Sequence, residues 1–307
     1  MSIDVNESQF GYQKDRELAQ LIVKFWRHKL LILAITSVFA VGGVFYALSK
    51  ANVYTAQAVL FSVSEQSGLK IPGQLGGLAA LAGVNIGGLS GGGDKTKVAL
   101  EVLKSREFIT RFIERHDLLV SVMAAKGWVQ SDNTLLIDDE IYQSSTQTWV
   151  RTVKAPFEPK PSLLEAYKVF EDMLKVSEDK TSGMITLSLT HYSPFLAKQI
   201  VDDLIKDLNS EMRNQEKNEA LNSIEYLTNQ IEKTSLAEVK TMLYSLIEEQ
   251  TKTLMLANVR DEYVFKVIDP AVVEEEKSGP MRAFIVILFC FLGGFLSLIT
   301  VLVFCRD

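Results

Sequence analysis

The sequence predicts an α+β domain with a long projecting helix, flanked by two transmembrane helices. Two apolar runs lie near the ends of the 307-residue chain. Each is long enough to cross a bilayer core, which takes roughly 20 apolar residues. Strand-like and amphipathic helical patterns fill the sequence between them. The predicted parts are a leader at 1–29, a first transmembrane helix at 30–50, an α+β domain at 51–282 with a helical arm at about 194–258, a second transmembrane helix at 283–305 and a tail at 306–307.

The basic residues beside the first run predict the orientation of the chain. Lys24, Arg27 and Lys29 precede this run closely, whereas Lys50 alone follows it. Lysine and arginine mark the cytoplasmic side, so we expect both termini in the cytoplasm and the main domain outside it. A cleaved signal peptide, with Ala47 and Ser49 as the small-residue pair, is the competing interpretation. The 29-residue leader and the long apolar run argue against cleavage.

Charge and cysteine content exclude some classes of function. The formal net charge of −6 argues against binding to nucleic acid, which favours a basic surface. Cys290 and Cys305 lie in or beside the second apolar run. The domain between the two runs therefore contains no disulfide, thiol nucleophile or thiolate metal site.

The elements of the domain follow from local patterns. Val53–Val63 is rich in β-branched and aromatic residues and predicts a strand. Ser162 and Glu165 form a capping-box pattern that opens a helix to about Leu174. We also expect a helix from Asp94 to about Arg115 with Val98, Val102, Phe108, Ile109 and Phe112 on one face, a strand pair at 176–179 and 184–190, and a strand at 263–268. Residues 128–160 are expected to be irregular, and the glycine-rich segment 68–93 to be a mobile loop or a segment ordered by neighbouring subunits.

The helical arm begins where Ser193 is suited to cap a helix and Pro194 to occupy its first position. Its apolar stripe thins between Asn209 and Glu219 and then resumes. A continuous helix to Glu232 would be about 57 Å long, which exceeds the width of such a domain. Part of it should therefore project. Thr234 and Ser235 offer a break and a new cap, after which a second helix returns along the arm as a coiled coil.

No arrangement of residues predicts catalysis, a cofactor or a metal ion. Gly88–Gly92 matches G-x-S-x-G without the flanking strand that a nucleophile elbow needs. Gly92–Thr96 resembles a phosphate loop in which Asp94 occupies the place of the required glycine. The remaining candidates are three scattered histidines, with His116 and His191 expected at the surface or in caps, and acidic runs at 138–140, 202–203 and 274–276, whose neighbouring side chains should point apart.

Four stretches, taken in this order, resemble the chain-length determinant (Wzz-type) polysaccharide co-polymerases. They are Leu21–Lys29 before the first apolar run, Val53–Ala56 in the first strand, Ser182–Ser188 followed by Pro194 and Ala197, and Val267–Ala271 followed by Lys277, Pro280 and Arg282. Glu274–Glu276 departs from the family, which often has further prolines there. The resemblance covers most of the chain except residues 65–93 and 128–160.

This resemblance implies a non-enzymatic regulator of the chain length of a surface polysaccharide, such as the O-antigen of lipopolysaccharide. It implies an inner-membrane protein with a periplasmic domain, a homo-oligomeric ring, and the polysaccharide polymerase and growing lipid-linked polymer as partners. Longer relatives carry a cytoplasmic kinase domain, and because the chain ends at Asp307 we expect no such activity.

Two other classes of function share this predicted topology. A two-span sensor or adaptor would bind a ligand or protein outside the cytoplasm, although a 29-residue leader is small for a signalling domain. A periplasmic hydrolase would need a catalytic pair, and the sequence offers none. For a ring, we expect the helix faces near Val98–Phe112 and Leu196–Leu208 to form the domain core and part of the subunit contact.

Overall fold

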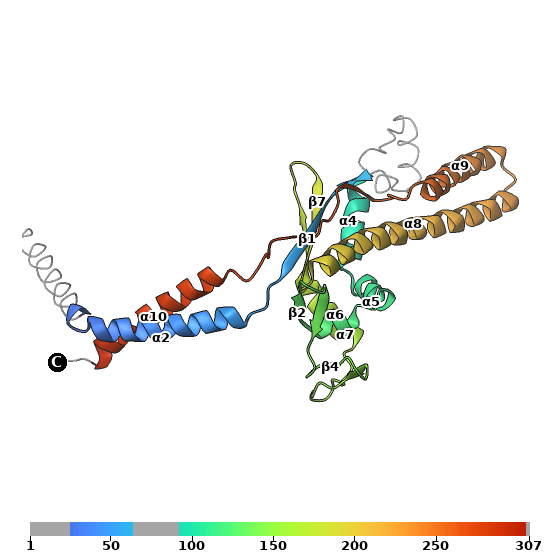
Figure 1. The fold of residues 1–307 in the computed structure, drawn as a ribbon. Helices are drawn as coiled ribbons and strands as arrows, with labels where there is room; N and C mark the ends of the chain where they lie inside the picture. Colours follow the sequence, from blue (N-terminus) through green and yellow to red (C-terminus); the bar gives the residue numbers. More distant parts are fainter. Residues whose placement is uncertain (1–24, 64–91, 305–307) are drawn as a thin grey trace, which may run out of the picture. The chain divides into compact units, whose positions relative to one another are not determined.

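The structure, a computed structural model, describes residues 25–63 and 92–304. The chain forms two compact units, one containing both terminal segments and the other spanning Val53–Lys277. Figure 1 shows the path of the chain through both. The fold class expected from the sequence, a mixed domain with a long helix between two long apolar helices, is confirmed. The prediction for residues 68–91 lies outside the described residues.

The first unit is a pair of apolar helices, α2 (Lys29–Ser49) and α10 (Arg282–Phe304). Both are long and apolar enough to cross a membrane, with mean hydropathies of 2.2 and 2.8. Phenylalanine packs on glycine twice in this pair. A Cβ added at Gly43 would lie 2.7 Å from Cβ of Phe289, and one added at Gly293 would lie 2.6 Å from Cβ of Phe39. Only glycine permits this close approach of the helices.

The second unit is built on a four-stranded antiparallel sheet in the order β6-β7-β1-β8. The strands are β1 (Tyr54–Ser62), β6 (Leu174–Glu178), β7 (Met184–His191) and β8 (Phe265–Asp269). Tyr54 pairs with His191 at one end of β1, and Phe61 pairs with Met184 near the other. Alternate residues of β1 and β7 are buried, so helices cover one face of the sheet.

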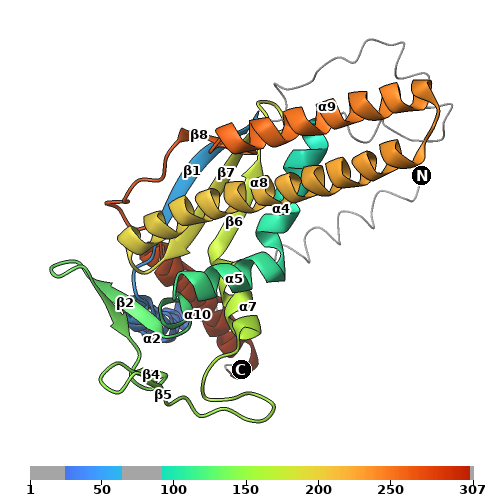
Figure 2. The same ribbon diagram turned by 90° about the vertical axis from the view of Figure 1, so that its right-hand side faces the viewer.

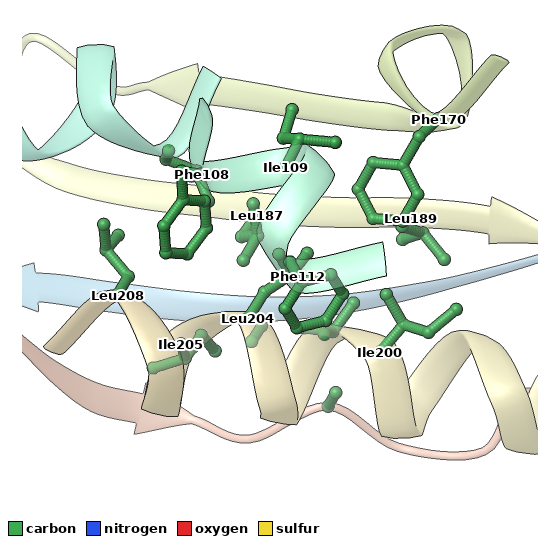
Figure 3. Close-up of a cluster of buried hydrophobic side chains, with 14 of the residues drawn as sticks. Phe108, Ile109, Phe112, Phe170, Leu187, Leu189, Ile200, Leu204, Ile205 and Leu208 are labelled. Carbon is green, nitrogen blue, oxygen red and sulfur yellow. The ribbon is translucent and has the colours of Figure 1, made fainter. Parts of the chain in front are cut away.

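Helices α5 (Arg106–Arg115), α7 (Leu163–Met173) and α8 (Pro194–Lys233) provide much of the core on that face. Figure 3 shows Phe112 of α5 and Leu204 of α8 meeting between the helices and the strands. The rings of Phe112 and Phe170 lie 5.9 Å apart, edge to face. This apolar layer holds α8 against the sheet.

The helix expected from Asp94 to Arg115 is broken into two. Helix α4 (Gly92–Lys104) ends before Ser105, whose ψ of 144° is incompatible with a continuous α-helix. The hydroxyl of Ser105 accepts a hydrogen bond from the backbone N–H of Phe108 and caps α5. The break lets α5 direct its phenylalanines into the core, while Val98 of α4 is 48% exposed and does not share the expected buried face.

The expectation that residues 128–160 are irregular is partly wrong. After the short helix α6 (Leu119–Met123), two hairpins follow: β2 (Ala125–Val129) with β3 (Thr134–Ile137), and β4 (Tyr142–Gln143) with β5 (Thr148–Trp149). The proline-containing segment beyond them is held by Arg151. Its guanidinium forms a two-point ion pair with Glu165, at 2.8 and 3.0 Å, and donates to the carbonyls of Glu158 and Pro159.

Glu165 also completes the capping box predicted from the sequence at the start of α7. Its carboxylate accepts from the backbone N–H of Ser162, and the Ser162 hydroxyl accepts from the backbone N–H of Glu165. The hydrogen bond from Arg151 is the main reason that the pKa of Glu165 is lowered. One side chain thus joins the helix N-terminus to the preceding loop.

The predicted long helix and returning helix are both present. Helix α8 has 40 residues, Ser193 caps it and Pro194 is its first residue. Helix α9 (Ala237–Val259) runs back beside the distal half of α8 (Figure 2). The expected new cap at Thr234 and Ser235 is wrong, because the N-cap of α9 is Leu236, which provides no side-chain cap.

His191 is 3% exposed, which corrects its assignment to the surface or a cap. Its Nε2 lies 3.1 Å from the carbonyl of Ser121, and its Nδ1 accepts from the backbone N–H of Ser193 at 3.0 Å. One donor and one acceptor are the complement of a neutral imidazole. Burial lowers the pKa of His191, which also favours the neutral form. The ring therefore fixes the junction between β7 and α8.

Asn209 joins α8 to the strand that follows the arm. Its Nδ2 donates to the carbonyl of Phe265 at 2.9 Å, and its Oδ1 accepts from the backbone N–H groups of Val264 and Phe265 at 2.9 and 3.0 Å. The side chain is buried, so these bonds form away from competing water. The chain leaves the domain as α8 and returns as β8 at this point.

The packing of the two apolar helices can be tested with matched glycine substitutions. Gly43→Ala places a methyl group against Phe289, whereas Gly42 has open space at the same position. We expect Gly43→Ala to destabilise the helix pair by about 1–3 kcal/mol, typical of overpacking. Gly42→Ala should be silent. Thermal unfolding in detergent measures both variants, and equal shifts would contradict this packing.

Loss of the Asn209 amide should weaken the second unit. Asn209→Ala leaves buried backbone groups of Val264 and Phe265 without partners, at a cost of about 2–4 kcal/mol. Asn218→Ala is the control, because Asn218 is an exposed asparagine of the same helix. Denaturant unfolding followed by circular dichroism should separate the two variants. A difference below about 0.5 kcal/mol would show that Asn209 has no such role.

Candidate interaction surface

The residue runs considered for catalysis do not form a reactive site in the described part of the chain. Gly88–Gly91 lies outside it, and Gly92–Thr96 begins α4, where Lys95 pairs with Glu216. Asp202 pairs with Lys198, while Asp203 faces His116 3.6 Å away, so these two carboxylates point apart as expected. Asp138 contacts Lys126 and the backbone N–H of Glu140. Among the described residues no group of three or more His, Cys, Asp or Glu could hold a metal ion.

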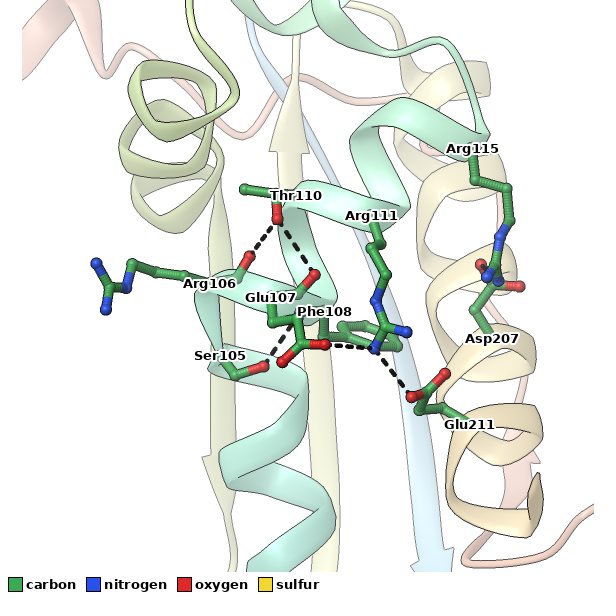
Figure 4. Close-up of polar contacts among 9 residues, drawn as sticks. All are labelled: Ser105, Arg106, Glu107, Phe108, Thr110, Arg111, Arg115, Asp207 and Glu211. Carbon is green, nitrogen blue, oxygen red and sulfur yellow. Dashed lines mark hydrogen bonds and ion pairs between the residues drawn. The ribbon is translucent and has the colours of Figure 1, made fainter. Parts of the chain in front are cut away.

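A ladder of ion pairs fastens α5 to α8, as Figure 4 shows in part. Arg111 pairs with Glu211 at 2.9 Å, and Arg115 pairs with Asp207 at 2.9 Å. His116 Nε2 lies 3.0 Å from the same Asp207 carboxylate oxygen. Because the Asp207 carboxylate is already paired with the guanidinium of Arg115, the contact with His116 is structural and does not form a set of metal ligands. The ladder holds α8 laterally where its apolar stripe meets α5.

A shallow groove of about 650 Å³ lies at the break between α4 and α5. It is lined by Lys104, Ser105, Arg106, Glu107, Thr110, Leu164 and Tyr167. The Tyr167 hydroxyl donates to the carbonyl of Lys104, and Arg106 points away from the other residues drawn in Figure 4. The groove is open and presents no paired acid and base, so it does not resemble an enclosed small-molecule site.

The arm, defined as residues 213–259 of α8 and α9 with their connection, is held together by a narrow seam. Its buried residues are Ala220, Ile231 and Ala257. Half-buried Leu243, Ile247 and Leu254 continue the seam on α9 at alternating spacings of four and seven residues. These positions follow the 3.5-residue repeat of coiled coils. Such a seam buries one edge of each helix and leaves the rest exposed.

Large apolar side chains lie outside this seam, on both helices and on their connection. They are Leu221, Tyr226, Leu236, Met242, Tyr244, Leu246, Met255, Leu256 and Val259, with exposed fractions between 38% and 82%. Two helices alone cannot bury so many apolar groups, and exposed patches of this kind mark protein–protein interaction sites. The arm is therefore the candidate interaction surface of this unit.

One family model matches the chain, over about a third of its length. Residues 15–116 match the family model described as "Wzz: Chain length determinant protein". No curated protein matches the chain. Among solved structures, a full-length bacterial polysaccharide co-polymerase is 13% identical, covers 92% of this chain and 95% of its own, and has a TM-score of 0.35. A fragment of WzzB from Salmonella Typhimurium is 14% identical, covers 74% of this chain and all of its own, and has a TM-score of 0.29.

The family match confirms the resemblance inferred from the sequence over residues 15–116. It includes the segments at Leu21–Lys29 and Val53–Ala56, which carried part of that resemblance. The identities and TM-scores of the two solved structures are too low to transfer a function. The similarity to the chain length determinant family is therefore shown for residues 15–116.

The sequence indicated the arm but not the residues that form its surface. Leu221 and Ile231 are both apolar and both lie in the predicted periodic stretch, yet Leu221 is 51% exposed and Ile231 is 9% exposed. The signal that could have separated them is the heptad register, because Ala220, Leu227 and Ile231 keep the coiled-coil spacing and Leu221 does not.

Alanine substitutions on the arm should separate folding from assembly. Leu221→Ala with Tyr226→Ala removes exposed groups, so we expect monomer stability to change by less than about 0.5 kcal/mol. Assembly should weaken, which the mass of the detergent-solubilised protein measures by light scattering. Ile231→Ala, the buried control, should lower the stability of the arm by about 2 kcal/mol or more. Unchanged assembly in the double variant would exclude this part of the arm as an interface.

Proposed function

We propose, from the match of residues 15–116 to the model of the Wzz chain length determinant family, that this chain regulates the length of a bacterial surface polysaccharide without catalysing a reaction. The polymer is O-antigen or a related surface polysaccharide. The chain acts as an oligomeric scaffold for the polymerase that joins the repeat units. The observation that carries the proposal is the family match, supported by the exposed apolar surface of the arm.

The proposed location follows from α2 and α10. We propose that both cross the inner membrane, with the N- and C-termini in the cytoplasm and residues 51–282 in the periplasm. The basic residues that precede α2 support this orientation. A domain held in one plane by two helices meets other copies at a high effective concentration, which favours even weak contacts between arms.

We propose that copies assemble as a closed ring through one repeated heterologous contact. In such a ring, the α8 face of one arm lies against the α9 face of the next. Exposed apolar residues on both helices support this arrangement, because each copy then provides two different surfaces. A two-fold dimer would instead use the same surface on both copies and leave the other exposed.

The function is tested by deleting the gene and separating the surface polysaccharide on a gel. We expect polymer to persist with a changed length distribution, which complementation by the intact chain restores. Loss of all polymer would favour an enzyme. An unchanged distribution would favour the two-span sensor or adaptor. The double variant of Leu221 and Tyr226, which is expected to fold, should fail to restore the length distribution.

Cross-linking tests the ring contact directly. In a background with Cys290→Ser and Cys305→Ser, Leu221→Cys is combined with Met242→Cys, one on each helix of the arm. A thiol cross-linker applied to membranes should give a ladder of products beyond the dimer, because a heterologous contact joins the two different positions in turn. Each single variant is the control and should remain monomeric, because a heterologous contact does not bring the same position of two copies together. Dimers from a single variant would indicate a two-fold contact. Monomers alone from the combined variant would contradict assembly through the arm.

A further inference from the structure

Three aromatic rings form a patch at one end of the sheet of the second unit. Trp128 of β2 stacks edge-on against Tyr54, the first residue of β1, with ring centroids 5.5 Å apart. The ring centroid of Phe195, near the start of α8, lies 6.1 Å from that of Trp128, and Phe195 is 48% exposed. The indole N–H of Trp128 donates to Asn133 at 2.9 Å. The patch therefore combines apolar ring faces with a polar edge.

The covalent chain keeps this patch near the end of α2. Arg282, the first residue of α10, donates to the carbonyl of Lys50 at 3.3 Å and to the amide oxygen of Asn52 at 3.1 Å. These bonds hold the first residues after α2 beside the start of α10. Tyr54 is two residues beyond Asn52, so it lies within roughly 7 Å of Asn52. Because α2 ends at Ser49, five residues before Tyr54, Tyr54 lies within roughly 18 Å of the end of α2.

Aromatic rings of this kind are typical of the membrane–water interface, the depth expected for residues near the end of a membrane-spanning helix. Tryptophan and tyrosine concentrate at membrane–water interfaces, where an apolar body faces the acyl chains and a polar edge faces water. Three rings are also much smaller than a stable protein–protein contact, which needs about 20 residues on each side. A lipid surface is therefore a better occupant than a second copy of the chain.

We propose that Tyr54, Trp128 and Phe195 rest in the headgroup layer of the bilayer that α2 enters, so that the β2–β3 hairpin is a membrane contact. The hairpin then helps to fix the tilt of the second unit relative to the bilayer. This inference depends on the proposed membrane crossing of α2 and is independent of the role in polysaccharide length.

Depth-dependent fluorescence quenching tests the contact in the full chain. Trp26→Phe and Trp149→Phe leave Trp128 as the single tryptophan. The protein is reconstituted into phosphatidylethanolamine–phosphatidylglycerol nanodiscs, with lipids either unmodified or brominated near the headgroup end of their acyl chains. We expect about a twofold loss of Trp128 emission in the brominated lipid, because interfacial rings lie at that depth. Equal emission in both lipids would overturn the proposal.

Two further variants make the result specific. A chain whose only tryptophan is Tyr226→Trp, on the arm, should show no quenching, and equal quenching there would mean that the signal is not interfacial. Phe195→Gln should reduce the quenching of Trp128, because it removes an exposed ring from the patch. If a second copy of the chain covered the aromatic patch instead of lipid, Trp128 emission would change with the number of protein copies per nanodisc. It would then be the same in brominated and unmodified lipid. That result would also overturn the lipid contact.

Discussion

The burial of one face of α8 against the sheet is the interaction on which the rest of the structure depends. Ile200, Leu204 and Leu208 recur every four residues and are at most 1% exposed. This stripe fixes the direction of the helix over its first four turns. Since an α-helix is stiff, the same direction is imposed on the residues beyond Met212, where little of the domain remains to pack against. The arm is thus a consequence of a core contact made elsewhere.

Much of the fold could be predicted where the signal is local. The capping box of Ser162 and Glu165, and Ser193 before Pro194, contain within a few residues all the hydrogen-bonding groups that start a helix. The break in the helix at Ser105 could not be predicted from such a local signal. Its apolar neighbours keep helical spacing on both sides, and only the need to direct Phe108 and Phe112 into one core selects two helices.

The burial of individual polar residues was harder to predict from the sequence, because it depends on partners far along the chain. Asn209 reads as the start of a polar section, yet it is buried because β8 returns to it from 55 residues further along the chain. His191 reads as an isolated polar residue, yet the carbonyl of Ser121 gives it a buried partner 70 residues away. A single sequence contains no direct record of such pairings.

The antiparallel register places the two proposed contacts at opposite ends of the second unit. Tyr54 pairs with His191 beside the start of α8, while Asn209 meets Phe265, the partner of Ser62 at the other end of β1. A bilayer at the Tyr54 end therefore leaves the arm on the side away from the lipid. The 21 residues from Arg213 to Lys233 extend α8 by about 30 Å beyond the sheet. Contact between arms would then occur well above the membrane, and the hairpin contact would set the angle at which neighbouring arms meet.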